Sequence, residues 1–438
     1  MLDQLRQPLR SRRFRLVWAG EGISILGDLS FEVAFIWLVL QETGSAATLA
    51  GVVLAQAIPR GVLMLIGGAM TDRLSPRTVM LATHLSRGTA VVALGLASVF
   101  DGVQTWQFYA IAVVMGTAEA FFWPASDSIV PSLVEKEDLA RANALTGFNE
   151  QGARLLGPVL GGALVASAGA TTAIFFNAAT FFLAALSLRA VPARPADPEA
   201  ASPSIAQIRS EIVSGLRYAR RSREVRSILL LISAAALSYS GLFSVGLPAL
   251  SKSFSESALT LGLLISSWGL GQLAGTIAAA VTGLPRRWGL LIIGMTLCEG
   301  LAFATLGFLP TPWAAATLLA VLGVGVAYSS DVALPTYIQT RTPADFLGRI
   351  NSIMSLPRVV LEPVSFALMG LLVTVGVRWG FLMAALPMLL VGITMALSKD
   401  ARSLSTQAVP ESDDTPADDT GKVPAPAGDT DTAPTPAA

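Results

Sequence analysis

The sequence predicts an all-α polytopic membrane protein with twelve transmembrane helices in two similar six-helix bundles. Its composition is the first indication. Of the 438 residues, 53% are apolar and only 14% are charged, whereas about 25% of the residues in soluble domains are charged. Twelve apolar stretches are the second indication, because each is long enough for a bilayer core, which takes about 20 residues per helix. An internal repeat, described below, is the third.

The remaining composition excludes other classes of protein. The chain has 30 basic and 30 acidic residues, so it lacks the basic excess of a nucleic-acid-binding protein. Its single cysteine excludes an internal disulfide and a multi-cysteine metal site. We therefore expect no metal and no nucleic-acid partner.

The predicted spans follow one another with short connections rich in turn-forming residues. Transmembrane strands would show segments of about ten residues that alternate in polarity, and that pattern is absent from the sequence. The first stretch is too long for a signal peptide and lacks a clean cleavage pattern, so we expect it to be retained. The spans cover residues 16–40, 46–70, 77–100, 104–131, 142–167, 171–190, 227–250, 258–283, 288–309, 312–338, 349–375 and 378–398.

The distribution of positive charge predicts the orientation. With the N-terminus inside, 24 of the 30 Lys and Arg residues lie on the cytoplasmic side and only Lys252 and Arg378 lie outside. This asymmetry follows the positive-inside rule and predicts that both termini are cytoplasmic. The other four basic residues lie within spans: Arg60, Arg87, Arg154 and Arg358.

The spans divide the chain into five parts. Residues 1–15 form a basic N-terminal segment, 16–190 the first bundle and 227–398 the second. The linker, 191–226, becomes basic and has apolar residues at helical spacing, so we expect an amphipathic helix on the inner membrane surface. The tail, 399–438, is acidic and has no apolar periodicity, which predicts disorder.

Three landmarks recur in the same order in both bundles, which predicts a duplicated unit. Asp127 and Asp331 end similar segments 204 residues apart. Asn143 and Asn351 follow at an offset of 208, and Pro158 and Pro363 at 205. Internal repeats of this kind are typical of secondary transporters, whose substrate site lies between the halves.

Two motifs resemble the major facilitator superfamily of transporters, and the resemblance extends over nearly all of residues 10–398. The segment Gly68-Ala-Met-Thr-Asp72-Arg73-Leu-Ser-Pro-Arg77 is similar to the family's G-x-x-x-D-R-x-G-R loop, with Ser75-Pro76 in place of the usual glycine. Gly157-Pro158-Val-Leu-Gly161-Gly162 is similar to the motif of proton-driven exporters. Gly27-Asp28 and Ala142-Asn143-Ala144-Leu145 resemble the drug:proton antiporter branch that contains macrolide and siderophore exporters. The arginine usual in span four of many drug antiporters is missing.

The resemblance implies a cytoplasmic gate formed by Gly68, Asp72, Arg73, Arg77 and Asp127. Asp127 would pair with one of the loop arginines, and Asp331 would pair with Arg286 or Arg287 in the second half. Such pairs close the inside of an outward-open state and break during alternating access. The alternative is ordinary anchoring of a charged loop.

The motif of span five consists of Gly157, Pro158, Gly161 and Gly162. Its glycines allow close helix packing, and its proline loosens the local hydrogen bonding. We interpret them as a flexible seam between the halves that favours export. The alternative is plain packing, because Gly and Pro are frequent in membrane helices.

Charged residues within spans are costly and usually functional. At one-turn spacing we expect the ion pairs Glu150–Arg154 and Arg358–Glu362, and we expect Arg60 to reach Glu32. Those pairs leave Asp28, Glu119 and Glu299 unpaired. A buried unpaired carboxyl holds its proton near neutral pH, so we take Asp28 and Glu119 as proton-coupling sites, with Glu32 assisting. The alternative is protonated carboxyls that make structural hydrogen bonds.

Among the aromatic residues we select Phe31, Trp123 and Tyr239 as lining a substrate cavity. The lone histidine, His84, is interpreted as a structural residue near the inner rim. The sequence has no phosphate-binding G-x-x-x-x-G-K-[ST] loop, which argues against ATP-driven pumping. We expect no cofactor and no enzymatic activity, with the proton gradient as the energy source.

Together these features predict a monomeric secondary transporter in a bacterial plasma membrane. It is expected to export amphipathic, drug-like small molecules by proton antiport through alternating access. The surplus of acids within the spans favours cationic or zwitterionic cargo. The alternatives are export of a siderophore or another secondary metabolite, and uptake by a permease. A membrane-embedded sensor or enzyme lacks any supporting motif.

Overall fold

The computed structural model describes residues 7–100, 102–192, 223–283, 288–334 and 344–398. Every regular element in these ranges is a helix. The predicted amphipathic helix of the linker falls almost entirely outside the described residues. The same is true of the predicted disordered tail and of Arg286 and Arg287.

The first half contains six long helices joined by short turns. They are α2 (Arg12–Thr43), α3 (Ala46–Leu74), α4 (Pro76–Phe100), α5 (Thr105–Ile129), α6 (Leu139–Ala168) and α7 (Ala170–Ser187). Short 3-10 turns flank them: η1 (Gln7–Arg10), η2 (Val130–Ser132), η3 (Lys136–Asp138) and η4 (Leu188–Ala190).

The second half also contributes six membrane-length segments, two of them interrupted by a π-helical stretch. The first is built from α9 (Arg223–Gly241), η5 (Leu242–Gly246) and α10 (Leu247–Phe254). The others are α11 (Ala258–Thr282), α12 (Trp288–Leu306), α13 (Pro312–Val326) continued by η6 (Ala327–Ala333), α15 (Ala344–Val375) and α16 (Val377–Leu397).

Eleven segments of the described chain are long and apolar enough to cross a membrane. The segment outside this group is α6, whose 30 residues are nevertheless sufficient in length. Its sequence up to Arg154 also carries Arg141, Asn149 and Glu150, and these polar residues lower its hydropathy. Because α6 packs between α2 and α11, it forms part of the bundle, and its polar residues belong to the region between the halves.

Local signals set the ends of the helices on the side away from the N-terminus. Gly44, at φ 63°, ends α2, and the Ser45 hydroxyl then accepts a hydrogen bond from the Thr48 N–H to start α3. Thr311 caps α13 in the same way, with Pro312 in the first turn. These caps satisfy backbone groups at helix ends with very few residues, which keeps the loops on this side short.

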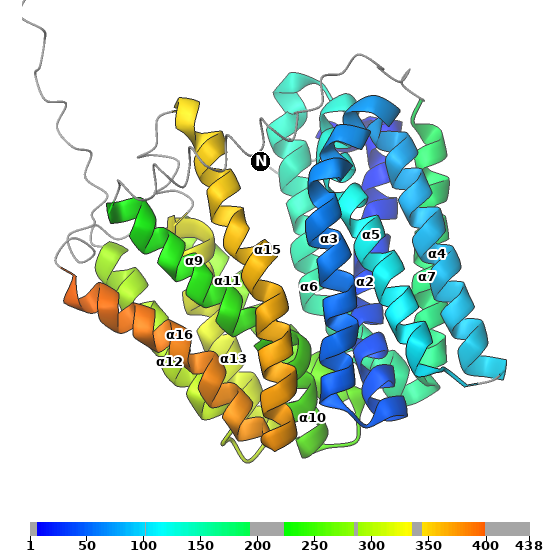
Figure 1. Cartoon of the computed structure of the whole chain (residues 1–438). Coiled ribbons are helices and arrows are strands. Elements are labelled where there is room, and N and C mark those ends of the chain that lie inside the picture. The colour runs from blue at the N-terminus through cyan, green and yellow to red at the C-terminus, as the bar shows by residue number, and fades with distance from the viewer. Residues whose placement is uncertain (1–6, 101, 193–222, 284–287, 335–343, 399–438) are drawn as a thin grey trace, which may run out of the picture.

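The two halves meet through two pairs of helices, α3 with α15 and α6 with α11. In Figure 1 the halves diverge on the side where α4 and α15 begin, and they approach each other near α10. The two contacts exchange under a two-fold relation between the halves, since α3 corresponds to α11 and α6 to α15. The predicted duplication of a six-helix unit is therefore visible in the packing.

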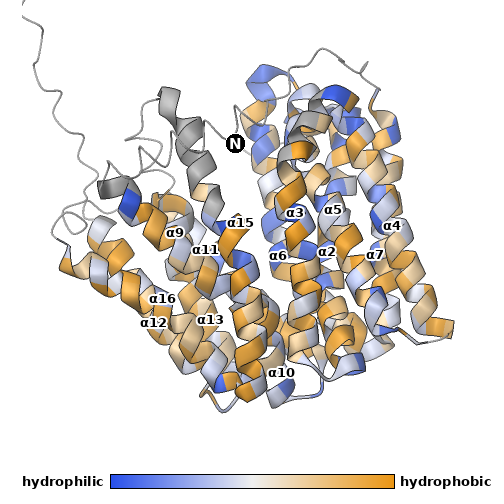
Figure 2. Cartoon of the chain, viewed as in Figure 1, coloured by the Kyte–Doolittle hydropathy of each residue, from blue (hydrophilic) through white to orange (hydrophobic). Residues whose placement is uncertain are grey.

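The outer faces of both bundles are apolar, and polar residues gather at helix ends and between the halves (Figure 2). Trp106, Trp313 and Trp379 are exposed in the first turns of α5, α13 and α16. All three turns lie on the side where the halves meet. Tryptophans anchor helices at a membrane interface, so the surface is that of a multi-pass membrane protein.

Ser75, in the loop between α3 and α4, occupies a backbone conformation that favours glycine. Its φ is 76° and its ψ is 141°, and among the described non-glycine residues no other has a positive φ. Its hydroxyl lies 3.0 Å from that of Thr78. This is the position at which the loop motif departs from the usual glycine, and the strain costs on the order of 1 kcal/mol or more.

We expect Ser75→Gly to stabilise the protein by roughly 1 kcal/mol, because glycine adopts positive φ without a clash of its Cβ. Thermal unfolding of the purified protein in detergent measures this as a rise in Tm. The matched control is Ser86→Gly in the middle of α4, which is expected to lower Tm because glycine weakens a helix interior. A lower Tm for Ser75→Gly would contradict the strain.

Candidate substrate and proton site

Two adjoining cavities lie between the halves. The larger has a volume of about 610 Å³ and is lined mostly by the second half. The smaller, of about 280 Å³, is lined mostly by the first half. Arg60, Ser244 and Phe366 line both cavities, so they form one continuous interior surface to which each half contributes a wall.

Arg60 on α3 bridges the halves at the junction of the two cavities. One guanidinium nitrogen lies 3.4 Å from a Glu119 oxygen on α5, and another lies 3.3 Å from a Glu362 oxygen on α15. The Arg60 side chain is 36% exposed. Partly hydrated ion pairs of this length contribute about 1 kcal/mol or less. The bridge can therefore break when the halves move apart.

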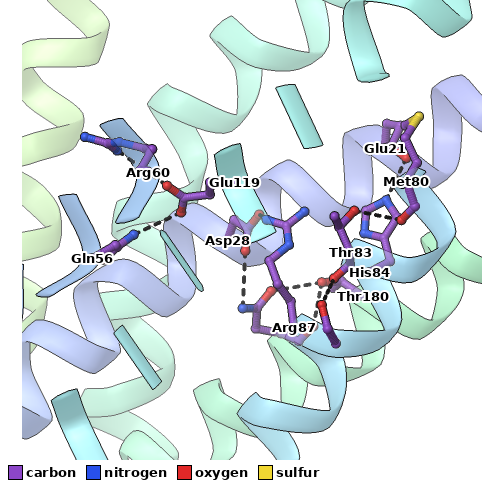
Figure 3. A network of polar contacts seen from close by, with 12 residues as sticks. Glu21, Asp28, Gln56, Arg60, Met80, Thr83, His84, Arg87, Glu119 and Thr180 are labelled. Atoms are coloured by element: carbon purple, nitrogen blue, oxygen red, sulfur yellow. Dashed lines mark hydrogen bonds and ion pairs between the residues drawn. The ribbon is translucent and has the colours of Figure 1, made fainter. Parts of the chain in front are cut away.

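Close packing of α3 on α5 places the partners of Glu119. At Gly116 a Cβ atom would collide with the Gln56 carbonyl oxygen, so only glycine permits this approach. One turn further along α5, Glu119 accepts a 2.9 Å hydrogen bond from the Gln56 amide in addition to its pair with Arg60 (Figure 3). Glu119 is thus held by two donors from a single neighbouring helix.

Arg87 on α4 is an almost fully buried charge. It is 2% exposed, and it donates to Asp28 on α2 over 2.9 Å. Its guanidinium lies between the rings of Phe122 and Phe181, 4.6 and 4.4 Å from their centroids. Removing one partner of a buried ion pair costs about 3–5 kcal/mol, and the two rings add cation–π attraction. Arg87 is therefore a fixed element of the first half, unlike Arg60.

The buried His84 also lies on α4, one turn from Arg87. Its Nε2 is 2.9 Å from a Glu21 carboxylate oxygen on α2. Sequence reasoning interpreted His84 as a structural residue and did not assign it this acidic partner.

The structure corrects the expected ion pairs. Asp28 and Glu119 were predicted to be unpaired. Asp28 is instead bound by Arg87, and Glu119 is bound by Gln56 and Arg60. Arg60 contacts Glu119 and Glu362 and not Glu32. Among the ion pairs of the described residues, none joins Glu150 to Arg154 or Arg358 to Glu362. Pairing across helices has replaced pairing along a helix, and the four residues of the two expected pairs line the cavities.

Sequence reasoning also missed Arg87 as a partner, and a signal for it was present. Glu21 and Asp28 are seven residues apart on span one, and His84 and Arg87 are three apart on span three. Both spacings keep side chains on one face of a helix. Matching the two faces gives the two pairs that the structure shows.

Glu32, Glu150 and Arg154 line the smaller cavity. Glu32 lies within electrostatic range of Glu119, Arg154, Arg60 and Asp28. The structure thus brings all three predicted proton-coupling acids to one wall, although it gives two of them partners.

The wall of the second half is aromatic. Tyr239 stacks on Phe243 at 5.9 Å and contacts Trp268 and Phe303 at centroid distances of 5.7 and 4.9 Å. Its hydroxyl donates to Glu299 over 2.8 Å, so Glu299 is not the unpaired acid that was predicted. Phe31 and Trp123 line the smaller cavity and Tyr239 lines the larger one. All three predicted aromatic residues therefore face the interior between the halves.

The predicted gate pairs are not formed in this arrangement. Asp127 is exposed, and Arg77 donates instead to the Leu188 carbonyl oxygen over 2.9 Å. No ion pair among the described residues joins Asp127 to Arg73 or Arg77. The gate was expected to form when the halves close on this side, and here the halves diverge. Gly68 lies within α3, and the side chains of Asp72 and Asp331 are not among those that the structure describes.

The motif of span five lies at the seam where α6 meets α2 and α11. A Cβ at Gly161 would strike the Ser30 carbonyl oxygen of α2, and one at Gly162 would lie 2.7 Å from the Ala258 oxygen at the start of α11. The Ser266 hydroxyl of α11 accepts from the Val159 N–H over 3.1 Å. The backbones of the two halves are therefore in direct contact at this motif.

A paired six-helix fold that encloses a polar and aromatic cavity at the junction of its halves defines a secondary transporter. A family model described as transmembrane secretion effector matches residues 5–421. The chain belongs to this family of the major facilitator superfamily.

Two relatives agree with this family. The multidrug efflux pump Tap of Mycolicibacterium fortuitum is 28% identical over 404 residues, which cover 90% of this chain and 95% of that protein. The enterobactin exporter EntS of Shigella boydii serotype 18 is 28% identical over 307 residues, covering 70% and 72%.

Two solved structures share the fold. The nucleoside transporter NupG, in a mutant form, has a TM-score of 0.65 at 14% identity and covers 87% of this chain and 100% of that one. A POT family transporter in complex with 5-aminolevulinic acid has a TM-score of 0.69 at 11% identity, with coverage of 90% and 97%.

We expect Gly162→Leu to separate α6 from α11 and to disfavour the present arrangement of the halves. A spin-label pair at Gln41 and Ser253, on the side where the halves meet, reports this as a longer distance in electron paramagnetic resonance. Gly147→Leu in the same helix is the matched control, because no atom lies within 4 Å of a Cβ there. An unchanged distance in Gly162→Leu would show that the motif only packs.

Proposed function

We propose that this chain exports amphipathic small molecules across the bacterial plasma membrane in exchange for protons. One observation carries the proposal: an acidic wall in the first half faces an aromatic wall in the second, and Arg60 joins them across the cavity. One chain supplies both walls, so the unit of transport is a monomer. Both termini lie in the cytoplasm, as the excess of positive residues on that side favours.

This orientation makes the structure an inward-facing state. The larger cavity extends along α9 from Tyr239 to Leu231 and along α15 to Met354, toward the side on which the halves diverge (Figure 1). On the opposite side, the Lys252 ammonium donates to the Leu40 carbonyl oxygen over 3.2 Å and links the two halves. Cargo therefore enters from the cytoplasm in this state.

The chemistry of the walls favours an aromatic cargo with a positive group. Tyr239, Phe243 and Trp268 offer ring surfaces for stacking. Glu32 and Glu119 on the other wall attract a cation. A volume of about 610 Å³ in the larger cavity alone lies within the range of pockets for drug-sized molecules.

Proton coupling follows from competition for the same carboxylates. A cationic cargo and a proton both neutralise Glu119 or Glu32, so binding of one lowers the affinity for the other. Protonation of Glu119 also removes one of the two charges that hold Arg60 and leaves the contact with Glu362, which joins the halves, as its remaining ion pair. Asp28 is the third acid of this wall and acts through its pair with Arg87.

Two relatives with 28% identity are named for export, and the span-five motif is intact. Both facts favour export over uptake. The enterobactin exporter among the relatives supports siderophore export as the second candidate. The number of acids on the cavity wall favours a cationic drug-like cargo over it.

An inverted-vesicle assay tests the proposal. Vesicles that contain the chain and hold a preformed pH gradient are expected to lose part of it when ethidium, an aromatic cation, is added. Asp28→Asn and Glu119→Gln are expected to reduce this loss at least tenfold, because neither side chain can then exchange a proton. The control variant is Glu42→Gln, at the exposed outer end of α2.

Equal amounts of each variant in the membrane make the comparison valid. Undiminished proton exchange in both Asp28→Asn and Glu119→Gln would overturn the assignment of these acids. Collapse of the gradient by enterobactin and not by ethidium would favour the siderophore alternative.

A further inference from the structure

The first half contains a buried ionisable pair that the proposed exchange does not use. The pair consists of Glu21, 8% exposed, and His84, 0% exposed, joined over 2.9 Å. Neither residue lines the two cavities between the halves. The pair lies among α2, α4, α5 and α7, closer than Asp28 and Arg87 to the ends of α2 and α4 at which the halves diverge.

The Glu21–His84 pair and the Arg87–Asp28 pair share one aromatic setting. The His84 ring contacts Phe122 at 5.2 Å and Phe181 at 5.9 Å, and the same two rings enclose the Arg87 guanidinium. Figure 3 shows Asp28 and Arg87 between the Glu119–Arg60 contact and the His84–Glu21 contact. Asp28 is within electrostatic range of both His84 and Glu119.

Four polar atoms of this cluster are buried without a hydrogen-bond partner. They are Glu21 Oε2, His84 Nδ1, Arg87 Nε and Arg87 Nη2. A buried polar atom left unpaired costs about 1–3 kcal/mol, which is unexpected in a purely structural contact. The free Nδ1 is also the atom that accepts a proton when Nε2–H donates to Glu21.

We propose that the Glu21–His84 pair is a proton-binding site whose occupancy is linked to that of Asp28. In one state Asp28 is ionised, Arg87 is positive, and an imidazolium lies beside an ionised Glu21. In the other state Asp28 carries the proton and His84 is neutral beside an ionised Glu21. The four groups have zero net charge in both states. Loss of the proton from Nδ1 therefore compensates its gain by the Asp28 carboxylate.

Electrostatic cost in a low dielectric favours this linkage. Arg87 always keeps its charge, so protonation of Asp28 alone would leave an uncompensated cation in the interior. Release of the proton from His84, toward the side where the halves diverge, leaves the Glu21 carboxylate to offset Arg87. The role of the site in transport rests on the proposed proton exchange, but the linkage itself does not.

Other charged groups near the cluster are accounted for. On α2 they are Glu21 and Asp28, and on α4 the nearest is Arg87. On α5, Glu119 is bound by Arg60 and Gln56, and Asp127 is exposed. Helix α7 has no ionisable residue, and the Glu150 and Arg154 side chains of α6 line the cavity. Besides its partner Glu21, Arg87 and Asp28 are therefore the charges that govern the His84 ring.

The chain has a single histidine, so this site can be observed directly. Nitrogen-15 histidine labelling of the full chain, purified in nanodiscs with a tag that lacks histidine, gives one imidazole in nuclear magnetic resonance spectra. We expect its signal to change from imidazolium to neutral ring between pH 5 and pH 9. In Asp28→Asn, which imitates the protonated acid, the midpoint is expected to fall by at least one pH unit, a tenfold change in affinity.

Two controls separate linkage from misfolding. Asp28→Glu keeps the negative charge beside Arg87 and is expected to restore the native midpoint to within a few tenths of a pH unit. Glu42→Gln, at the far end of α2, is expected to leave it unchanged. Glu21→Gln removes the partner of the imidazolium and is expected to lower the midpoint.

An imidazole that stays in one neutral tautomer across this pH range would overturn the proposal and make His84 structural. A titration unaffected by Asp28→Asn would overturn the linkage. If vesicles of the native chain exchange no protons for ethidium while the titration still responds to Asp28→Asn, the site stands and the proposed antiport fails.

Discussion

The buried charge of Arg87 is the constraint on which the polar interior of the first half depends. A guanidinium that is 2% exposed requires an anion beside it, because an unpaired charge in a low dielectric costs several kcal/mol. Asp28 supplies that anion, and the rings of Phe122 and Phe181 exclude water from both faces of the guanidinium. Since Arg87 cannot lose its proton, every change of protonation at Asp28 must be balanced by another group. The ionisation of one acid in this half therefore depends on the protonation of the other groups.

Arg60 differs from Arg87 in solvation, and the difference separates their roles. Both side chains contact carboxylates, but Arg60 is 36% exposed and its two contacts are longer than 3.2 Å. Water that reaches Arg60 lowers the free energy needed to break its contact with either carboxylate. The bridge can therefore open and close at little energetic cost. Arg87 holds a local structure in place, whereas Arg60 connects the halves. In the proposed exchange one half stays rigid while it moves against the other, which needs both kinds of contact.

Sequence analysis predicted the all-helical architecture of two bundles, and it did not predict the ion pairs. Hydropathy fixes the spans because burial in lipid acts on whole segments of about 20 residues. The glycines at 161 and 162 were informative because their lack of a side chain has a direct packing consequence. Partner choice depends on how helices rotate against one another. The pairs Glu150–Arg154 and Arg358–Glu362 satisfied one-turn spacing, but their helices present them to an open cavity. Gln56 and Asn177 are uncharged, so a search for charged residues does not find them. They nevertheless donate hydrogen bonds to Glu119 and to Asp28, respectively.

Movement of the halves has an electrostatic consequence at the Arg60 bridge. When α15 moves away from α3, Glu362 loses its contact with Arg60 while Glu119, on the same half as Arg60, keeps its own. The carboxylate of Glu362 is then uncompensated unless it meets a cation or a proton, and Arg358, one turn away and a lining residue of the larger cavity, is the nearest base on its helix. Arg60 in turn neutralises Glu119 fully once it no longer serves two acids. Separation of the halves thus leaves the negative charge of Glu362 uncompensated on the wall of the second half. The aromatic cluster of Tyr239 and Trp268 lines the same cavity. In the proposed exchange, the affinity of that wall for a cation is coupled to the distance between α3 and α15.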